Sequence, residues 1–295
     1  MTEDASEAFA RLGNETRMAI LEALTTVEEG RVRPTERTFT ELFEATDEST
    51  TAGFSYHLRQ LRGEYVEQVD DGYALTYAGL KVVREIAAGT YTERFDLAPL
   101  AVPDPCPFCS GGLEATGEDN VLTVSCVDCE RDVLVLPFPP GGHATHDEGE
   151  LLAAFDRHHR HRVRLMREGS CPECGGATHR EVDVGGDRPH AELECSACGY
   201  ALRCPVALTV LEHPAVVSHY HEQGEDVRDH PVWNVGDGWT ETVLSEDPVC
   251  VRVGVRVGDE HLTLLVGEDC SVVHTERTTV EPAERDAEAP DATAA

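Results

Sequence analysis

Cysteine is the residue type whose spacing in this chain most directly indicates chemistry. Eight of the eleven cysteines form four Cys-x-x-Cys pairs. Two thiolates three residues apart can bind one metal ion from a tight turn, and two such turns complete a tetrahedral four-thiolate site. The inserts between the paired turns are 16 and 20 residues, close to the spacing of structural zinc sites. The candidate ligands are Cys106, Cys109, Cys126, Cys129, Cys171, Cys174, Cys195 and Cys198.

This pattern predicts two structural zinc ions per chain, with iron or a redox role as the alternatives. A closed shell of four thiolates leaves no position for water or substrate. Cys204, Cys250 and Cys270 lie outside the pairs, and we expect them to be small buried side chains. The chain contains no HExxH, Walker loop, GxSxG elbow or GxGxxG before a helix. The sequence therefore does not indicate an enzyme.

The charge balance is strongly acidic. There are 56 Asp and Glu residues against 24 Lys and Arg, the net charge is −32, and Lys81 is the single lysine. Acid excess with almost no lysine resembles the proteins of extreme halophiles. At molar salt the Debye length falls to about 3 Å, so the acidity does not exclude a nucleic-acid partner. No run of about 18 apolar residues and no signal peptide is present, which predicts a cytoplasmic protein without a membrane span.

The first third of the chain has a helical pattern with one hairpin. Apolar spacing predicts helices through residue 27, with Asn14 as a cap, and a loop follows over residues 28–37. Further elements are a short helix capped by Thr38, a helix over residues 50–62, a hairpin over 65–75 and a helix over 76–89.

Two stretches of this region resemble a known family. Leu-Gly-Asn-Glu-Thr-Arg at residues 12–17 and Tyr-His-Leu-Arg-Gln-Leu at 56–61 resemble the ArsR-type regulators that carry a C-terminal extension. The resemblance covers about the first 95 residues and implies a winged helix-turn-helix over residues 1–98. It also implies a homodimer that binds double-stranded DNA, paired through helices such as 4–12 and 76–89. No cysteine precedes Cys106, so the metal-sensing cysteines of that family are absent.

The outward face of helix 50–62 is the candidate for reading the major groove, because its inward positions are apolar. We expect base contacts from Ser55, Tyr56, Arg59 and Gln60, and phosphate contacts from Thr51 and Arg62. The alternative is a module that uses the winged helix and the cysteine region for protein contacts, for example with the transcription machinery. The acidic turn over residues 70–72 departs from a phosphate-binding wing.

The rest of the chain repeats itself. Pro99 to Pro105 suggests a linker, and equivalent cysteines then recur after 65 and 69 residues. Each double pair precedes a strand-like run and a histidine-containing helix. The strand-like runs are 133–137 and 204–208, and the helices are 151–167 and 214–223.

The sequence thus predicts an α+β multidomain protein. The winged helix is followed by two tandem zinc-ribbon-plus-helix units over residues 99–168 and 169–235, then by a small β-rich segment over 236–280. Residues 281–295 are acidic and are expected to be disordered. The basic block over residues 157–167 is interpreted as a solvated helix face, with a phosphate or acidic partner as the alternative.

Overall fold

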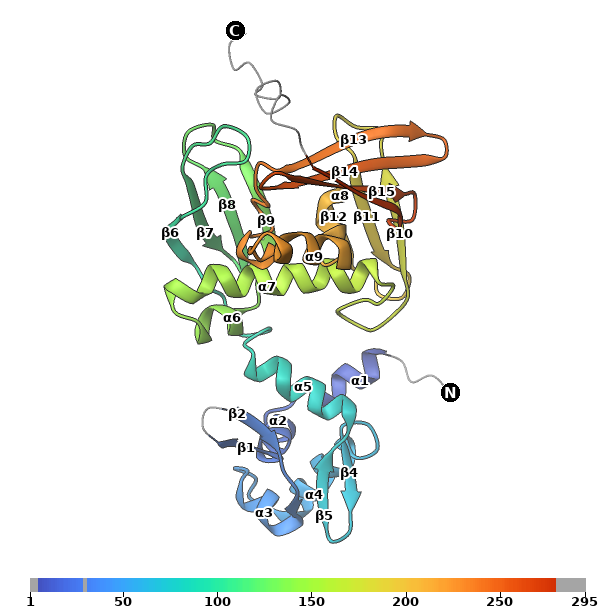
Figure 1. Ribbon diagram of the computed structural model, residues 1–295. Helices are drawn as coiled ribbons and strands as arrows, with labels where there is room; N and C mark the ends of the chain where they lie inside the picture. Colours follow the sequence, from blue (N-terminus) through green and yellow to red (C-terminus); the bar gives the residue numbers. More distant parts are fainter. Residues whose placement is uncertain (1–4, 29–30, 280–295) are drawn as a thin grey trace. The chain divides into compact units, whose positions relative to one another are not determined.

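The computed structural model describes residues 5–28 and 31–279, and the chain forms two compact units (Figure 1). Unit 1 contains residues 1–95 and 139–145, and unit 2 contains residues 96–138 and 146–295. Both units mix helices with antiparallel sheets, so the α+β class is confirmed. The tail expected at residues 281–295 lies outside the described residues.

Unit 1 contains six helices and five strands among its described residues. In chain order they are α1 (Ala5–Leu12), α2 (Glu15–Ala23), β1 (Thr25–Glu28), β2 (Arg31–Pro34), β3 (Arg37–Thr38), α3 (Phe39–Glu44), α4 (Thr51–Leu61), β4 (Val66–Val69), β5 (Gly72–Leu75), α5 (Tyr77–Ala87) and α6 (Pro140–Thr145). Side chains that accept amide hydrogens at N-caps define where several helices begin. These caps are Asn14, Thr38, Thr50 and Thr76.

One stretch of unit 1 differs from the expectation. The predicted loop over residues 28–37 contains β2 and part of β3, and the expected helix stops at Ala23 instead of residue 27. Thr25, Thr26 and Val27 are β-branched, and such side chains favour extended backbone. Strand β1 pairs with β2, with Val27 opposite Val32.

The core of unit 1 joins α2, α3, α4 and the strands β4 and β5. Phe54 on α4 is fully buried and makes edge-to-face contacts with Phe39 and Phe43, at centroid distances of 5.0 and 5.5 Å. Such aromatic pairs contribute about 0.5–1.5 kcal/mol beyond area burial. The apolar face of α4 therefore fixes its rotation, and the opposite face is exposed.

Gly79 brings α5 close to the backbone that precedes β4. An added Cβ at Gly79 would lie 2.1 Å from the Tyr65 carbonyl oxygen, a distance that no rotamer change can relieve. We expect Gly79→Ala to lower the free energy of unfolding of unit 1 by about 1–3 kcal/mol. Denaturant titration followed by circular dichroism measures this change. Gly13→Ala is the control, because the nearest atom to its added Cβ is 3.9 Å away. Equal denaturation midpoints for the two variants would show that the backbone around Gly79 shifts to accommodate the added methyl group.

Unit 2 contains three antiparallel sheets and four helices among its described residues. Its elements are β6 (Leu97–Val102), β7 (Leu113–Glu118), β8 (Val121–Cys126), β9 (Asp132–Pro137), α7 (Glu148–Arg167), β10 (Thr178–Asp183), β11 (His190–Cys195), β12 (Ala201–Pro205), α8 (Val206–Val210), α9 (Pro214–Glu222), the 3-10 helix η1 (Val227–Asp229), β13 (Trp239–Glu246), β14 (Val249–Val257), β15 (Glu260–Gly267) and β16 (Val272–Thr279). The sheet orders are β6-β7-β8-β9, β10-β11-β12 and β13-β14-β15-β16. We call the first two the first and second cysteine sheets.

Two boundaries in unit 2 correct the expectations. The predicted linker over residues 99–105 is partly strand β6, in which Leu100 pairs with Ala115 and Val102 pairs with Leu113. Pro99 is tolerated there because β6 is an edge strand with a register shift at that point. The strand expected over residues 204–208 ends at Pro205, where α8 begins.

The sequence predicts that the basic block on α7 is a solvated face with intramolecular pairs to carboxylates; the pairs form, but the solvated face is wrong for its central residues. Helix α7 runs along both cysteine sheets (Figure 1), and His159 and Arg160 are only 2 and 5 % exposed. Arg160 donates to Asp156, at 3.4 Å, and to the His230 carbonyl oxygen. Burial lowers the pKa of His159 to about 3, so its ring is neutral. The block stabilises the interior of unit 2, and Arg157 and Arg164 are among its exposed members.

Candidate metal centres and nucleic-acid interface

The four cysteine turns share one backbone geometry. The amide of the first cysteine in each turn donates to a carbonyl five residues further on. These bonds are Cys106 to Gly111, Cys126 to Arg131, Cys171 to Gly176 and Cys195 to Tyr200. The residue after the second cysteine has a positive φ in every turn, at Ser110, Glu130, Gly175 and Gly199. The repeated local spacing therefore produces the same turn four times.

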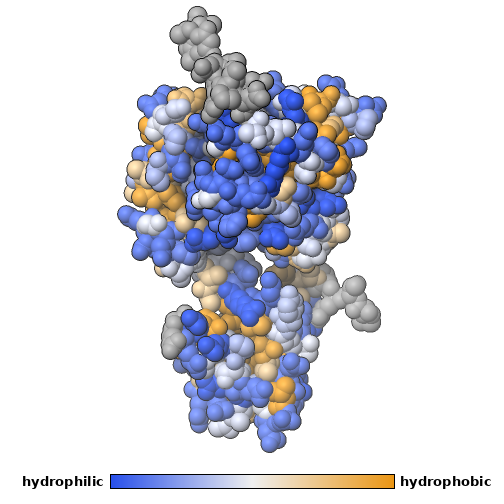
Figure 2. Space-filling model, in the orientation of Figure 1, coloured by the Kyte–Doolittle hydropathy of each residue, from blue (hydrophilic) through white to orange (hydrophobic). Residues whose placement is uncertain are grey.

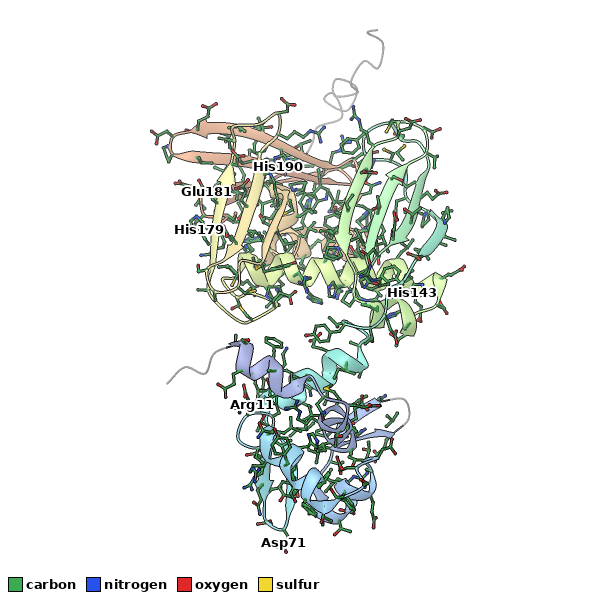
Figure 3. The ribbon with its side chains drawn as sticks, turned by 180° about the vertical axis from the view of Figure 1, so that it is seen from behind. Arg11, Asp71, His143, His179, Glu181 and His190 are labelled. Atoms are coloured by element: carbon green, nitrogen blue, oxygen red, sulfur yellow. The ribbon has the colours of Figure 1, made fainter. Side chains whose placement is uncertain are left out.

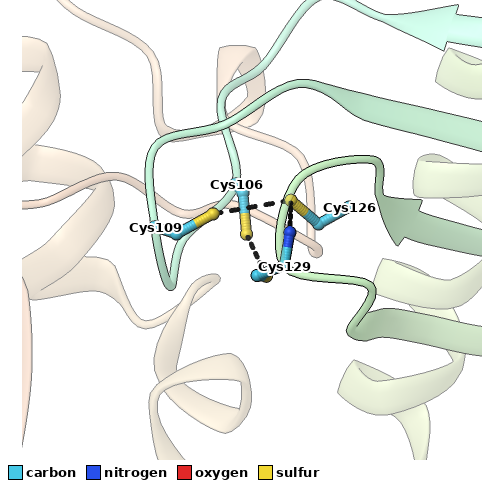
Figure 4. A group of neighbouring side chains, drawn as sticks. All are labelled: Cys106, Cys109, Cys126 and Cys129. Atoms are coloured by element: carbon cyan, nitrogen blue, oxygen red, sulfur yellow. Dashed lines mark hydrogen bonds between the residues drawn. The ribbon is translucent and has the colours of Figure 1, made fainter.

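The turns bring the eight predicted ligands into two clusters. Site 1 consists of Cys106, Cys109, Cys126 and Cys129 (Figure 4), and site 2 of Cys171, Cys174, Cys195 and Cys198. Within each cluster all Sγ atoms lie within 4.8 Å of one another. The closest sulfur pairs are 3.5 and 3.9 Å apart in site 1 and 3.6 Å apart in site 2. Tetrahedral Zn–S bonds of about 2.3 Å require sulfur separations of about 3.8 Å, so each cluster fits one such ion.

Backbone amides prepare one thiol in each site for metal binding. The amides of Cys129 and Asp128 donate to the Cys126 sulfur and lower its pKa to about 7. The amides of Cys198 and Ala197 lower the pKa of Cys195 to about 6. Because metal ions bind the thiolate and not the thiol, these bonds favour the ligating form.

The two sites differ in what surrounds their turns. In site 1, Arg131 lies over the Phe108 ring at 5.3 Å, so the two turns contact each other directly. The equivalent positions in site 2 are Glu173 and Tyr200, which contact Arg162 of α7 instead. Arg162 forms an ion pair with Glu173, donates to the Tyr200 hydroxyl at 2.8 Å and lies 4.6 Å from its ring centroid. Site 2 is thus linked to α7.

We expect Arg162→Gln to release metal from site 2 on the order of ten times faster, because hydrogen bonds of a charged group are lost on both turns. Site 1 should be unaffected, so chelator-driven release should separate into two phases. Arg164→Gln is the control, because Arg164 is on the same helix but forms its ion pair with the exposed Glu168, which belongs to neither cysteine turn. A uniform rate increase at both sites would contradict a specific role for Arg162.

The candidate nucleic-acid interface is the outward face of α4. Thr51, Ser55, Tyr56, Arg59 and Arg62 are exposed and Gln60 is half-buried. The opposite face buries Phe54, Leu58 and Leu61. The six predicted side chains therefore occupy the turns of one helix and its C-cap.

Two of these side chains are already oriented by neighbours. The Arg59 guanidinium lies 5.9 Å from the centroid of the Tyr56 ring. Arg62 donates to the Gln68 side chain on β4 at 3.0 Å, which connects the end of α4 to the hairpin. The hairpin turn is acidic, with Asp70 and Asp71 exposed, and Figure 3 shows Asp71 at its tip.

Sequence reasoning missed the side chains that support the metal sites. They are Phe108, Arg131, Glu173, Tyr200 and Arg162. The first four could have been found from the sequence, because each lies two residues after the first or the last cysteine of a site. Arg162 could not have been found in this way, because its contacts with site 2 depend on how α7 packs.

Two four-cysteine clusters, each built from paired cysteine turns on an antiparallel sheet and each able to hold one metal ion, define the class of unit 2 as a duplicated four-cysteine fold. The chain belongs to the family described as Domain of unknown function (DUF7351), whose model matches residues 103–272. A second model, Domain of unknown function (DUF7347), matches residues 5–86. No curated protein and no solved structure matches the chain. Within the described residues, no helix combines the length and apolar character needed to cross a bilayer.

Proposed function

We propose that this protein is a sequence-specific DNA-binding transcriptional regulator that reads the major groove with α4. The observation that carries the proposal is the division of α4 into a buried apolar face and an exposed face of hydroxyl, amide, aromatic and guanidinium groups. A helix fits the major groove, and these groups can bond to base edges and phosphates there.

The order of elements around α4 supports a winged helix-turn-helix. Helix α3 precedes α4, and the hairpin β4–β5 and helix α5 follow it, as expected from the ArsR-type resemblance. We also propose a homodimer that pairs through α1 and α5. Phe9 on α1 and Tyr77 on α5 are 71 and 80 % exposed, and such large apolar side chains are available to a second copy.

The metal ions are proposed to be zinc with a structural role, because four thiolates complete the shell and leave no position for catalysis. The protein is therefore proposed not to be an enzyme. The acidic composition and the single lysine support the cytoplasm of a salt-accumulating cell as its location.

A protein-interaction module of the transcription machinery is the second candidate. The exposed Asp70 and Asp71 at the hairpin tip favour it, because carboxylates there repel phosphate. In this case α4 would contact a protein instead of DNA.

Genome-wide DNA occupancy, measured at the native salt concentration, tests the proposal. Discrete footprints with a shared two-fold sequence support a dimeric regulator, with half-sites about one helical turn apart. Copurification with polymerase in the absence of footprints would favour the interaction module and overturn the regulator.

A further inference from the structure

Among the described residues, helices cover one face of the sheet formed by β13 to β16, and the arginines of its strand β14 are exposed on the other. Helices α8 and α9 pack against β13, β14 and β15 (Figure 1). Along β14 the buried side chains are Val251, Val253, Val255 and Val257, and the alternating Arg252 and Arg256 are exposed. The strand alternation therefore assigns both arginines to the outer face.

The cross-strand register identifies which side chains share this outer face. Arg252 lies opposite Thr242 and Leu265, and Leu265 lies opposite His274. Gly254 lies opposite Thr240 and Thr263, and Arg256 lies opposite His261. The remaining positions on these rows are Glu276 and Thr278. Glu276 is the one carboxylate among these rows, in a chain with 56 acidic residues.

The two arginines have no carboxylate partner among the described residues. Arg252 donates a hydrogen bond to the Thr242 hydroxyl at 3.5 Å, and no ion pair within 4.0 Å joins Arg252 or Arg256 to another described residue. Some exposed arginines elsewhere in unit 2 are paired with carboxylates, although Arg157 is exposed without such a pair among the described residues. Arg203 lies 3.6 Å from both Asp183 and Glu192, and Arg228 pairs with Asp226 at 2.5 Å.

The centre of the face is kept shallow by Gly254. An added Cβ there would lie 2.6 Å from the Thr240 hydroxyl and 2.9 Å from His261 Nε2, so both side chains lie across the glycine. His261 Nδ1 is 3.4 Å from the Thr263 hydroxyl. Hydroxyl and imidazole groups thus fill the space between the two arginines.

We infer that this outer face binds the phosphate backbone of nucleic acid. Its side chains are mainly hydrogen-bond donors, and planar guanidinium groups match phosphate oxygens in geometry as well as charge. Arg252 and Arg256 are four residues apart on an extended strand, a separation of about 13 Å, which suits a ligand with repeating charges. Apolar pockets for peptide side chains are not a feature of these rows, so an acidic peptide fits less well.

This binding would be independent of sequence, because phosphate contacts carry no base information. The inference goes beyond the reading role proposed for α4 and does not depend on it. Phosphate binding would be a function of the C-terminal sheet that is separate from the metal sites.

The test measures binding of the full-length, metal-loaded chain to a labelled random-sequence duplex over a series of salt concentrations. The variant carries Arg252→Gln and Arg256→Gln. We expect about a ten-fold weaker Kd, and a slope of log K against log salt that is smaller by about two, since each phosphate contact contributes about 0.9. Arg203→Gln is the matched control, because that exposed arginine is already paired, and its slope should equal that of the parent protein.

Two further arms separate the possible results. The same pair of substitutions is placed in a chain whose α4 carries Arg59→Ala, so that failure of the α4 proposal leaves the sheet measurement intact. A single-stranded probe and a polyglutamate peptide replace the duplex in parallel titrations. An unchanged salt slope in the variant, or tighter binding of polyglutamate than of either nucleic acid, would overturn the inference. Metal content and circular dichroism equal to those of the parent protein confirm that the variant is folded.

Discussion

Removal of the metal ions is expected to unfold both cysteine sheets while α1 to α5 stay folded. Each sheet has a small apolar core; in the first it consists mainly of Leu113, Ala115, Leu122 and Val124. A structural four-thiolate site contributes about 10–16 kcal/mol of apparent binding free energy, which exceeds the stability of most domains. We therefore expect the cysteine turns to lose their shape without the ion. Unit 1 contains no cysteine and should be insensitive to chelation.

Hydrogen exchange measured before and after chelation distinguishes the two units. Amides in β7, β8, β10 and β11 should lose protection, and those in α2 and α4 should keep it. Cys126→Ser should reproduce the effect at site 1 without a chelator, and native mass spectrometry should fall from two metals per chain to one. Cys250→Ser is the control, since Cys250 belongs to neither site. Retained protection in the cysteine sheets after complete metal loss would refute the structural role.

Replacement of Ser55 and Arg59 by alanine is expected to abolish specific promoter binding. A good base contact contributes about 1–3 kcal/mol of discrimination, so the loss of two contacts should weaken specific binding by a factor on the order of a hundred or more. Both side chains are exposed, so the substitutions should leave the stability of unit 1 unchanged. Footprinting and anisotropy titration on a promoter found by occupancy mapping measure the change.

Arg33→Ala is the matched control for this experiment. Arg33 is also exposed in unit 1, but it belongs to the β1–β2 hairpin and pairs with Glu28 at 3.7 Å. Its loss should leave the specific affinity within about two-fold, as for most surface substitutions. Unchanged promoter affinity in the variant with Ser55 and Arg59 replaced would show that α4 is not the helix that reads the DNA sequence.

The parts that the sequence predicted correctly depend on local spacing. Cys-x-x-Cys constrains its own turn, so four copies of the motif gave four equal turns and two clusters. The 4-and-3 spacing of Phe54, Leu58 and Leu61 fixed which face of α4 is buried. In both cases the residues that determine the geometry are within a few positions of one another.

The features of the fold that could not be predicted from the sequence depend on packing between distant segments. The composition of α7 between Arg157 and Arg162 is typical of a solvated helix, yet Arg160 is buried with the carboxylates of Asp156 and Glu212 and the His230 carbonyl around its guanidinium. Strand β6 pairs with the edge of β7, and Pro99 within β6 made this stretch of the sequence resemble a linker. Pairing between Leu100 and Ala115 in the sheet, or a hydrogen bond from Arg160 to a carbonyl 70 residues away, leaves no periodic signal in the sequence.

The position of α6 has a consequence for cutting and recombining this chain. Residues 139–145 follow strand β9 of unit 2, yet they belong to unit 1, where His143 stacks on Phe95 at 4.7 Å. The polypeptide therefore passes between the units three times, and no single cleavage point separates them. A fragment that ends at residue 95 lacks a piece of its own unit. A gene fusion that transplants unit 1 should supply residues 139–145 as well, for example as a tethered peptide.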